Sequence, residues 1–397
     1  MLNNLHIKNF RILEDLEIPK LGRVNLIVGK NNSGKSTVLE ALRVVAGKAH
    51  PSLLREILLG HDENFNIDGD LAIENPRPNR SGLKHLFTNR ELPNSNDVYI
   101  SIDSEGSQLL KIEHVFYYIK EAVEENEDGD PVNLVRRRVI INPSDFNELK
   151  QTTESSAELP DFIPALRITS DSGRSALLDL DDNVPRANYS MAWRGMDDEN
   201  AINHSYVSTE FTTAETLSLL WDKIAISPYE AIVLEALQII DKNVERLAFV
   251  EDAGSRSPRE KKRIAIVKLR ESDKRIPLNS MGDGMSRILQ LILSVFPAKN
   301  GVLLIDEFEN GLHFSVQKEV WRMLFKLASE LDIQVFATTH SWDCIESFSK
   351  AAANEQEAGV LLKISRSRLT SDNGKIIATV YDKAALQTIT ESELEVR

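Results

Sequence analysis

The chain is poor in cysteine and in long apolar runs. Its single cysteine, Cys344, excludes an intrachain disulfide and a zinc cluster built on several cysteines. No apolar run approaches the ~18 residues that a membrane span needs, and residues 1–10 lack a signal-peptide core. A heptad repeat long enough for a coiled-coil arm is also missing. We therefore expect a cytoplasmic protein without a membrane partner.

An excess of positive charge is missing as well, because the formal net charge is −14. A protein that grips DNA usually presents a positive field, since neutralising phosphates supplies most non-specific affinity. The acidic total therefore favours protein partners over nucleic acid. Two basic clusters keep direct nucleic-acid binding open, although each also fits a solvated strand end or hairpin tip. They are Arg136, Arg137 and Arg138, and then Arg256, Arg259, Lys261, Lys262 and Arg263.

A phosphate-binding loop stands near the start of the chain. Residues 29–36 read Gly-Lys-Asn-Asn-Ser-Gly-Lys-Ser, after the apolar segment 24–28 and before the helix-forming run 37–46. Gly29 and Gly34 allow the backbone to curl so that its N–H groups point at phosphate oxygens. The strand–loop–helix order predicts a nucleoside triphosphate site.

Two side chains of this loop carry the expected contacts to the triphosphate. Lys35 is expected to reach the β- and γ-phosphates, and the hydroxyl of Ser36 to bind Mg²⁺. The other loop and helix residues expected at the nucleotide are Asn31, Asn32, Ser33 and Thr37.

A second acidic centre lies far downstream. Residues 301–307 read Gly-Val-Leu-Leu-Ile-Asp-Glu, an apolar strand that ends in two carboxylates. Strand residues alternate sides, so Asp306 and Glu307 cannot share one task. We expect Asp306 to bind Mg²⁺, directly or through water, and Glu307 to polarise the water that attacks the γ-phosphate. The other interpretation is an acidic strand end that caps the next helix.

A histidine ends another strand of buried type, residues 335–341. At the carboxyl edge of a parallel sheet, His340 would lie in the ligand crevice and hydrogen-bond the γ-phosphate. A lone histidine is more often structural. Its spacing, 34 residues after Asp306, favours a catalytic-site residue that senses the γ-phosphate.

A second glycine segment, residues 278–285, reads Leu-Asn-Ser-Met-Gly-Asp-Gly-Met and opens a helix over 286–296. Ser280, Gly282 and Gly284 expose backbone N–H groups at the helix start, which predicts another anion site. One nucleotide needs one phosphate loop, so we expect this segment to close over ATP that is bound to another copy. A Gly-x-Gly at a helix start is weak evidence by itself.

In this order, the motifs resemble the ATPases of the ABC superfamily, in the branch of the SMC, RecF and OLD-like proteins. Residues 7–11 and 310–313 are typical of that branch too. The resemblance implies adenine preference, Arg11 close to the nucleotide, and a homodimer or higher oligomer. Each ATP would lie between Lys35 of one copy and Ser280 of the other. The second glycine segment departs from the Leu-Ser-Gly-Gly-Gln form of transporter ATPases, which argues against a transporter subunit.

The resemblance is strongest to stand-alone OLD-like ATPases, in which this glycine segment and an ending like residues 389–397 recur. Such ATPases often occur in antiphage defence, including PARIS-type, Septu- and Gabija-like systems. Full-length OLD proteins carry a TOPRIM nuclease domain, whereas residues 341–397 show no corresponding carboxylate set. Asp179-Leu180-Asp181-Asp182 mimics half of one, but its polar surroundings predict a solvated loop.

These observations leave two functions open. The first is an ATP-driven switch that controls a separate effector protein, such as a TOPRIM-type nuclease, in antiphage defence. The alternative is a RecF- or SMC-like DNA-binding ATPase in DNA repair. A metabolic kinase is disfavoured because the second glycine segment makes the site two-sided.

The expected fold is α/β: a P-loop ABC-ATPase head with an added antiparallel β layer and a helical lobe. We expect residues 1–150 to form the nucleotide-binding lobe, 151–275 an insert, and 276–397 a lobe that completes the head. Gly47 is expected to cap the first helix, and residues 152–203 remain unplaced. Further strands are predicted at 5–10, 13–18, 98–102, 109–118, 135–141, 247–250 and 264–269, and helices at 214–224 and 228–242.

Overall fold

The computed structural model describes residues 1–63, 80–125, 131–152, 160–180, 202–251, 262–270, 274–353, 355, 359–383 and 385–386. The chain folds into two compact units, and each unit is built from more than one segment of the sequence. The first unit consists of residues 1–4, 18–39 and 202–397, and the second of residues 5–17 and 40–201. The three-segment division expected from the sequence cuts the chain elsewhere and stays a prediction.

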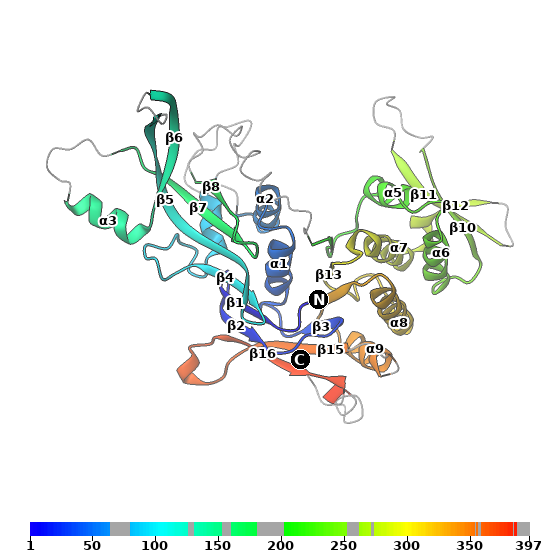
Figure 1. Cartoon of the computed structure of the whole chain (residues 1–397). Coiled ribbons are helices and arrows are strands. Elements are labelled where there is room, and N and C mark those ends of the chain that lie inside the picture. The colour runs from blue at the N-terminus through cyan, green and yellow to red at the C-terminus, as the bar shows by residue number, and fades with distance from the viewer. Residues whose placement is uncertain are drawn as a thin grey trace. The chain divides into compact units, whose positions relative to one another are not determined.

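A six-stranded sheet forms the centre of the first unit, in the order β16-β15-β3-β14-β13-β9 (Figure 1). Its neighbours are parallel except for the antiparallel pair β15–β16. β3, β13 and β14 are buried along their whole length, as apolar strands covered on both faces must be. The strands are β3 (Val24–Val28), β9 (His204–Val207), β13 (Val302–Ile305), β14 (Gln334–Thr339), β15 (Gly359–Arg366) and β16 (Ile376–Tyr381).

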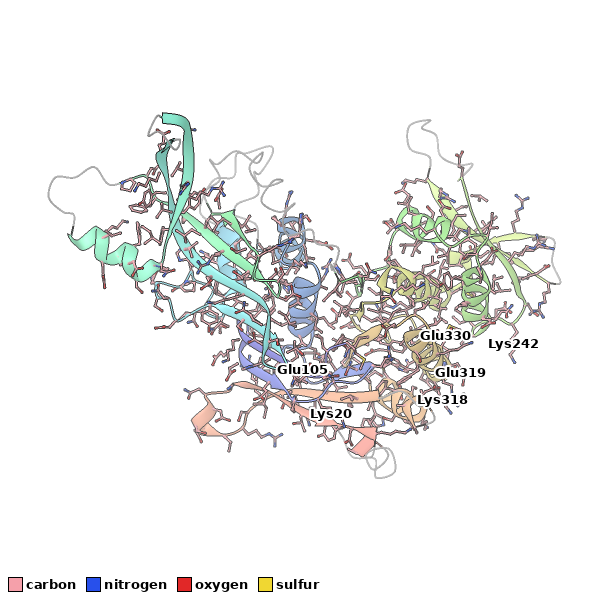
Figure 2. The ribbon with its side chains drawn as sticks, viewed as in Figure 1. Lys20, Glu105, Lys242, Lys318, Glu319 and Glu330 are labelled. Atoms are coloured by element: carbon pink, nitrogen blue, oxygen red, sulfur yellow. The ribbon has the colours of Figure 1, made fainter. Side chains whose placement is uncertain are left out.

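Three helices pack on this sheet: α8 and α9 each bury one face, and α7 is buried at all positions from 287 to 295. In α8, Trp321 is fully buried and stacks on Phe308 with a ring separation of 3.8 Å. Glu319 and Glu330, labelled in Figure 2, lie on the exposed side of the same helix. The helices of this layer are α7 (Asp283–Val295), α8 (Phe314–Glu330) and α9 (Trp342–Ala352). Short 3₁₀ helices are η2 (Leu278–Met281), η3 (Phe296–Ala298) and η4 (Thr370–Asp372).

The first unit also contains the helical lobe that the sequence predicts. It consists of α5 (Ala214–Asp222) and α6 (Tyr229–Gln238) beside a three-stranded sheet of β10 (Val244–Glu251), β11 (Arg263–Leu269) and β12 (Arg275–Pro277). Within the basic cluster 256–263, residues 256–261 lie outside the described part of the chain. Arg263 lies on β11 and pairs with Asp222.

The second unit contains the predicted antiparallel layer. Its strands run in the order β2-β1-β4-β5-β7-β8, with β6 paired to β5. The strands are β1 (Leu5–Phe10), β2 (Leu13–Ile18), β4 (Ile100–Ser104), β5 (Ser107–Glu125), β6 (Pro131–Ile141), β7 (Ile163–Ser170) and β8 (Ser175–Asp179). The helices are α2 (Pro51–Leu59), α3 (Pro143–Thr152) and the 3₁₀ helix η1 (Arg80–Leu86).

α1 (Lys35–Ala46) begins in the first unit and continues into the second. It ends at Ala46, so Gly47 stands at the cap position as expected, and the left-handed residues after it are Lys48 (φ 49°) and Ala49 (φ 50°). The N–H of Ala49 donates to Val44 O at 2.7 Å, and that of Lys48 to Val45 O at 3.0 Å. These two bonds close the helix as a Schellman motif, with lysine at the position that glycine usually takes.

Two other local expectations change. β7 and β8 fill part of the stretch that the sequence left unplaced, and Asp179 is buried at the end of β8 rather than in a solvated loop. Asp181, Asp182 and residues 389–397 lie outside the described residues. No helix in the described ranges is long and apolar enough to cross a membrane.

Candidate active site

The phosphate loop leaves the carboxyl end of β3 and enters α1, as the sequence predicts. Gly29 has φ 156°, and a Cβ there would lie only 2.2 Å from the carbonyl oxygen of Ile364 on β15. Gly34 has φ 101°, and Asn32 is left-handed at φ 59°. The loop therefore needs glycine at two positions, one for close approach and one for conformation.

Lys35 extends back over this loop. Its Nζ donates to the carbonyl oxygens of Gly29 at 2.9 Å and Lys30 at 3.1 Å. Burial lowers the pKa of Lys35. The negative charges of Asp306, Glu307 and Glu309 oppose this shift. The ammonium group therefore lies in a partly buried position facing acidic side chains.

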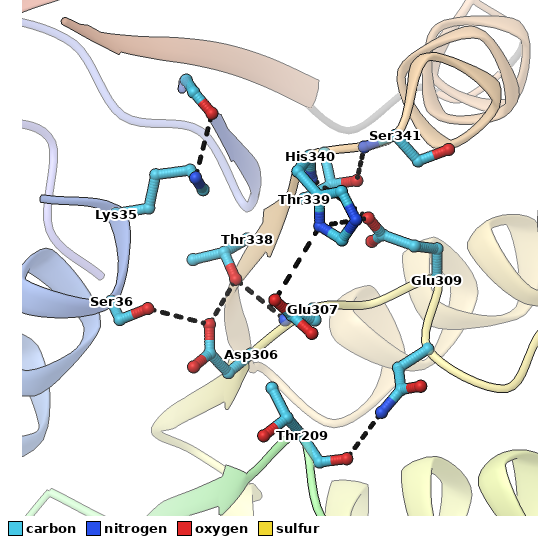
Figure 3. A network of polar contacts seen from close by, with 12 residues as sticks. Lys35, Ser36, Thr209, Asp306, Glu307, Glu309, Thr338, Thr339, His340 and Ser341 are labelled. Atoms are coloured by element: carbon cyan, nitrogen blue, oxygen red, sulfur yellow. Dashed lines mark hydrogen bonds and ion pairs between the residues drawn. The ribbon is translucent and has the colours of Figure 1, made fainter. Parts of the chain in front are cut away.

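Asp306, just after β13, connects three segments of the first unit (Figure 3). Its Oδ1 accepts hydrogen bonds from Ser36 Oγ at 3.3 Å and Thr338 Oγ1 at 2.5 Å. Its backbone N–H donates to Val207 O, at the end of β9, at 2.8 Å. Folding thus brings a carboxylate to the hydroxyl of the phosphate loop, 270 residues away in sequence.

The oxygens of Ser36 and Asp306 suit a small, hard cation. Mg²⁺ is typically held by one or two protein oxygens, with waters and substrate phosphates completing its shell. The donor set therefore fits the expected Mg²⁺ site, and Ser36 and Asp306 are the residues that would hold the ion.

Glu307 adopts an unusual backbone conformation, with φ 47°. A non-glycine residue in the left-handed region costs about 1–3 kcal/mol and persists only where surrounding contacts impose it. Here its N–H donates to Thr338 Oγ1 at 2.9 Å. The half-exposed carboxylate lies 3.8 Å from Nδ1 of His340, so the two predicted catalytic groups are neighbours.

Glu309 is a site residue that the sequence reading missed. Its Oε1 lies 3.2 Å from Nδ1 of His340 and accepts the backbone N–H of His340 at 3.0 Å. The side chain of Glu309 is only 11% exposed, whereas that of His340 is 55% exposed. A buried carboxylate therefore orients an exposed imidazole. The available signal was a third carboxylate two residues after Glu307.

Arg287 of α7 is the second missed residue. It is fully buried, and its guanidinium donates to the backbone carbonyls of Asp306 at 2.9 Å and Glu307 at 3.0 Å. Arg287 lies among buried residues of α7 that include Gln290 and Ser294, and nothing in the sequence pattern pointed to this contact.

The second glycine segment forms η2, then Gly282 at φ 97°, then the start of α7 at Asp283. Ser280 and Gly282 are exposed, as an anion site requires. Gly284 is half-buried in the first turn of α7, and a Cβ there would lie 3.2 Å from Gly311 O. Gly284 thus serves close packing, and the anion-binding role of the segment stays a prediction.

The remaining predicted residues lie as follows. Arg11, in the second unit, is buried and pairs with Glu40 at 2.8 Å and Glu63 at 3.0 Å. Its expected nearness to the nucleotide stays a prediction. Asn31 and Asn32 are exposed, Ser33 is buried and Thr37 is half-buried.

Comparisons with known proteins place the chain in a family of ATPases. A family model described as "AAA ATPase domain" matches residues 1–345. The chain is 25% identical to the ATP/GTP phosphatase of Helicobacter pylori, over 87% of each chain. It is 23% identical to the OLD nuclease of Thermus scotoductus, over 86% of this chain and 59% of that protein.

Two shorter or more distant likenesses complete the comparison. The DNA replication and repair protein RecF of Proteus mirabilis is 31% identical over 28% of each chain. An SMC head bound to the C-winged helix domain of ScpA aligns over 98% of this chain and 99% of that chain, with 14% identity and a TM-score of 0.47.

Proposed function

The chain belongs to the AAA ATPase domain family and is an ATPase of the SMC, RecF and OLD type. From that premise we propose that it is a molecular switch, which closes on a second copy around ATP and controls a separate effector protein. The proposal rests on one arrangement: Asp306 accepts hydrogen bonds from Ser36 and Thr338. The carboxylate of Glu307 lies beside His340 in the same site.

We assign the steps of hydrolysis to side chains of this site. Lys35 and the loop N–H groups bind the phosphates. Ser36 and Asp306 would hold a Mg²⁺ ion, which would supply positive charge beside the phosphates. Glu307 accepts hydrogen bonds from the attacking water and orients it. The Nε2 side of His340 remains available to the γ-phosphate because Nδ1 faces Glu309.

Closure on a second copy is proposed from the second glycine segment. Ser280 and Gly282 are exposed at the N-terminus of α7, a helix of 13 residues whose first N–H groups favour an anion. A phosphate bound by the loop of one copy would complete this anion site on the other.

The effector is proposed from the relatives rather than from a site on this chain. One relative is an OLD nuclease, so an ATPase of this type occurs together with nuclease activity. We propose that the ATP cycle of this chain governs an effector of that class, a TOPRIM-type nuclease, and that the system acts in antiphage defence.

A DNA-binding ATPase is the second candidate, and two observations favour it. Part of the chain is related to RecF, and Arg136, Arg137 and Arg138 are exposed on β6. Arg136 is paired with Glu121 at 3.0 Å, which reduces its availability to phosphate.

The test is purification of the Glu307→Gln variant from the native host with ATP present, followed by light scattering. We expect a closed homodimer or larger assembly that carries a stoichiometric protein partner. A dimer that retains nuclease-sensitive DNA and no protein partner would establish the second candidate instead. A monomer in excess ATP would refute closure around the nucleotide.

A further inference from the structure

Arg287 is a buried cation whose hydrogen bonds are all to uncharged groups. Its side chain is 0% exposed. Nη1 donates to Ser208 O at 2.8 Å and Nη2 to the carbonyls of Asp306 and Glu307. Nη1 also lies 3.4 Å from Oε1 of Gln290. One guanidinium thus connects α7, the segment after β9 and the turn after β13.

Such a cation is costly to bury, so an arginine at this position needs an explanation. Burial lowers the pKa of Arg287 to about 10, although the carboxylates of Asp306, Glu309 and Glu307 oppose the shift. The neighbouring positions of α7 are filled by apolar residues such as Ile288 and Leu291. An aliphatic side chain would fill the space without this cost, but it would remove the guanidinium donor from the carbonyls of Ser208, Asp306 and Glu307. Among the described residues, the carbonyl of Glu307 would keep only the N–H of Asn310, at 3.0 Å.

Two of these carbonyls belong to the turn that presents the catalytic carboxylate. Glu307 is held in the left-handed region, where its N–H meets Thr338 and its carbonyl meets Arg287. We propose that Arg287 is a positioning residue for Glu307. It fixes the backbone on the carbonyl side of the turn and so keeps the carboxylate beside His340.

The same contact links the second glycine segment to hydrolysis. Arg287 lies about one turn after Asp283, the first residue of α7, and Ser280 and Gly282 lead directly into that helix. A displacement of the α7 start on nucleotide engagement would therefore reach Glu307 through Arg287. This inference depends on the proposed role of Glu307, and the experiment separates the two.

The experiment compares Arg287→Lys and Arg287→Met with the wild-type chain in steady-state ATP hydrolysis. We expect kcat to fall ~10- to 100-fold with little change in KM for ATP, because small displacements of a catalytic group have effects of this size. Arg287→Lys should retain more activity than Arg287→Met, since an ammonium group still reaches part of the carbonyl set. If Arg287→Met fails to fold, Arg287→Lys still allows the test, because it keeps a positive charge at this position.

The decisive measurement is a double-mutant cycle with Glu307→Gln. If Arg287 acts through Glu307, Arg287→Lys will slow residual hydrolysis little in the Glu307→Gln background. The matched control is Gln317→Met, which removes another buried donor to a backbone carbonyl, that of Leu312 at 3.0 Å. Gln317→Met should lower the melting temperature. Its effect on kcat should be small and equal in the wild-type chain and in the Glu307→Gln variant.

Equal fold-losses for Arg287→Lys with and without Glu307→Gln would overturn the inference. The inference would also fail if Gln317→Met lowered kcat as much as Arg287→Lys does, at an equal loss of stability. A Glu307→Gln single variant with wild-type kcat would instead refute the role proposed for Glu307.

Discussion

At the residue scale, the phosphate loop contains two lysines with different surroundings. Lys35 is half-buried over the loop carbonyls, whereas Lys30 is exposed. Only Lys35 is proposed to contact the phosphates, so Lys30 serves as its matched control.

We expect Lys35→Ala to abolish triphosphate binding at micromolar concentration. The loss of a charge-assisted contact to two phosphates removes several kcal/mol, on the order of a hundredfold or more in Kd. Titration calorimetry with a slowly hydrolysed ATP analogue measures it, with Lys30→Ala as the control. Equal affinities for the two variants would contradict the assignment.

Glu309 offers a second test at this scale. Glu309→Gln keeps the size and the acceptor for the His340 N–H but removes the negative charge beside Nδ1. We expect kcat to fall ~10-fold or more with unchanged ATP affinity, because the imidazole loses its charged partner. The control is Glu346→Gln on α9, a half-exposed carboxylate that pairs with Lys350. A shifted pH–rate profile in Glu309→Gln alone would distinguish orientation of His340 from general destabilisation.

At the scale of elements, the phosphate loop packs closely against β15 at Gly29. Gly29→Ala would place a Cβ against Ile364 O, a backbone atom that cannot rotate away. We expect a lower melting temperature together with loss of ATP binding. Gly106→Ala is the matched control, because Gly106 also has positive φ (74°) but no atom near its missing Cβ. A Gly29→Ala variant as stable and as active as Gly106→Ala would refute the close approach.

In the second unit, the stability of the fold is expected to depend on pH through the pair of His61 and Glu40. A hydrogen bond from Glu40 of α1 raises the pKa of His61 above its ordinary value of 6.5. The protonated form is favoured in the folded state, so this stabilisation is complete below pH 6.5 and is lost as pH rises through the raised pKa. Thermal unfolding of wild type and His61→Gln should therefore differ at pH 5.5 and converge at high pH. A difference that does not depend on pH would contradict this linkage.

At the scale of the whole molecule, closure between two copies can be blocked without touching the phosphate loop. Ser280→Arg places a bulky cation on the exposed segment before α7. In the Glu307→Gln background with ATP, we expect light scattering to report a monomer whose ATP affinity is nearly unchanged. Ser172→Arg, on an exposed turn of the second unit, should still close. A large loss of affinity in Ser280→Arg would indicate a site made within one chain.

Local patterns predicted much of the first unit. β3, β13 and β14 were visible as apolar runs that end in polar motifs, and two helices and a hairpin of the lobe were placed correctly. β9 and β15 were missed, because a strand is defined by partners such as Ile305 or Leu26 that lie far away in sequence. Gly47 caps α1 as predicted, but the left-handed residues Lys48 and Ala49 after it gave no sequence signal.

The sequence by itself determined the chemistry of this protein. Residues 29–36 specify a phosphate loop through local steric freedom and backbone N–H groups, and Asp306, Glu307 and His340 end strands whose apolar runs require burial. Only the tertiary structure decided how those groups are held. The side chain of Arg287 donates to backbone carbonyls that are 19, 20 and 79 residues away, and such contacts leave no trace in the sequence pattern because any residue supplies a carbonyl.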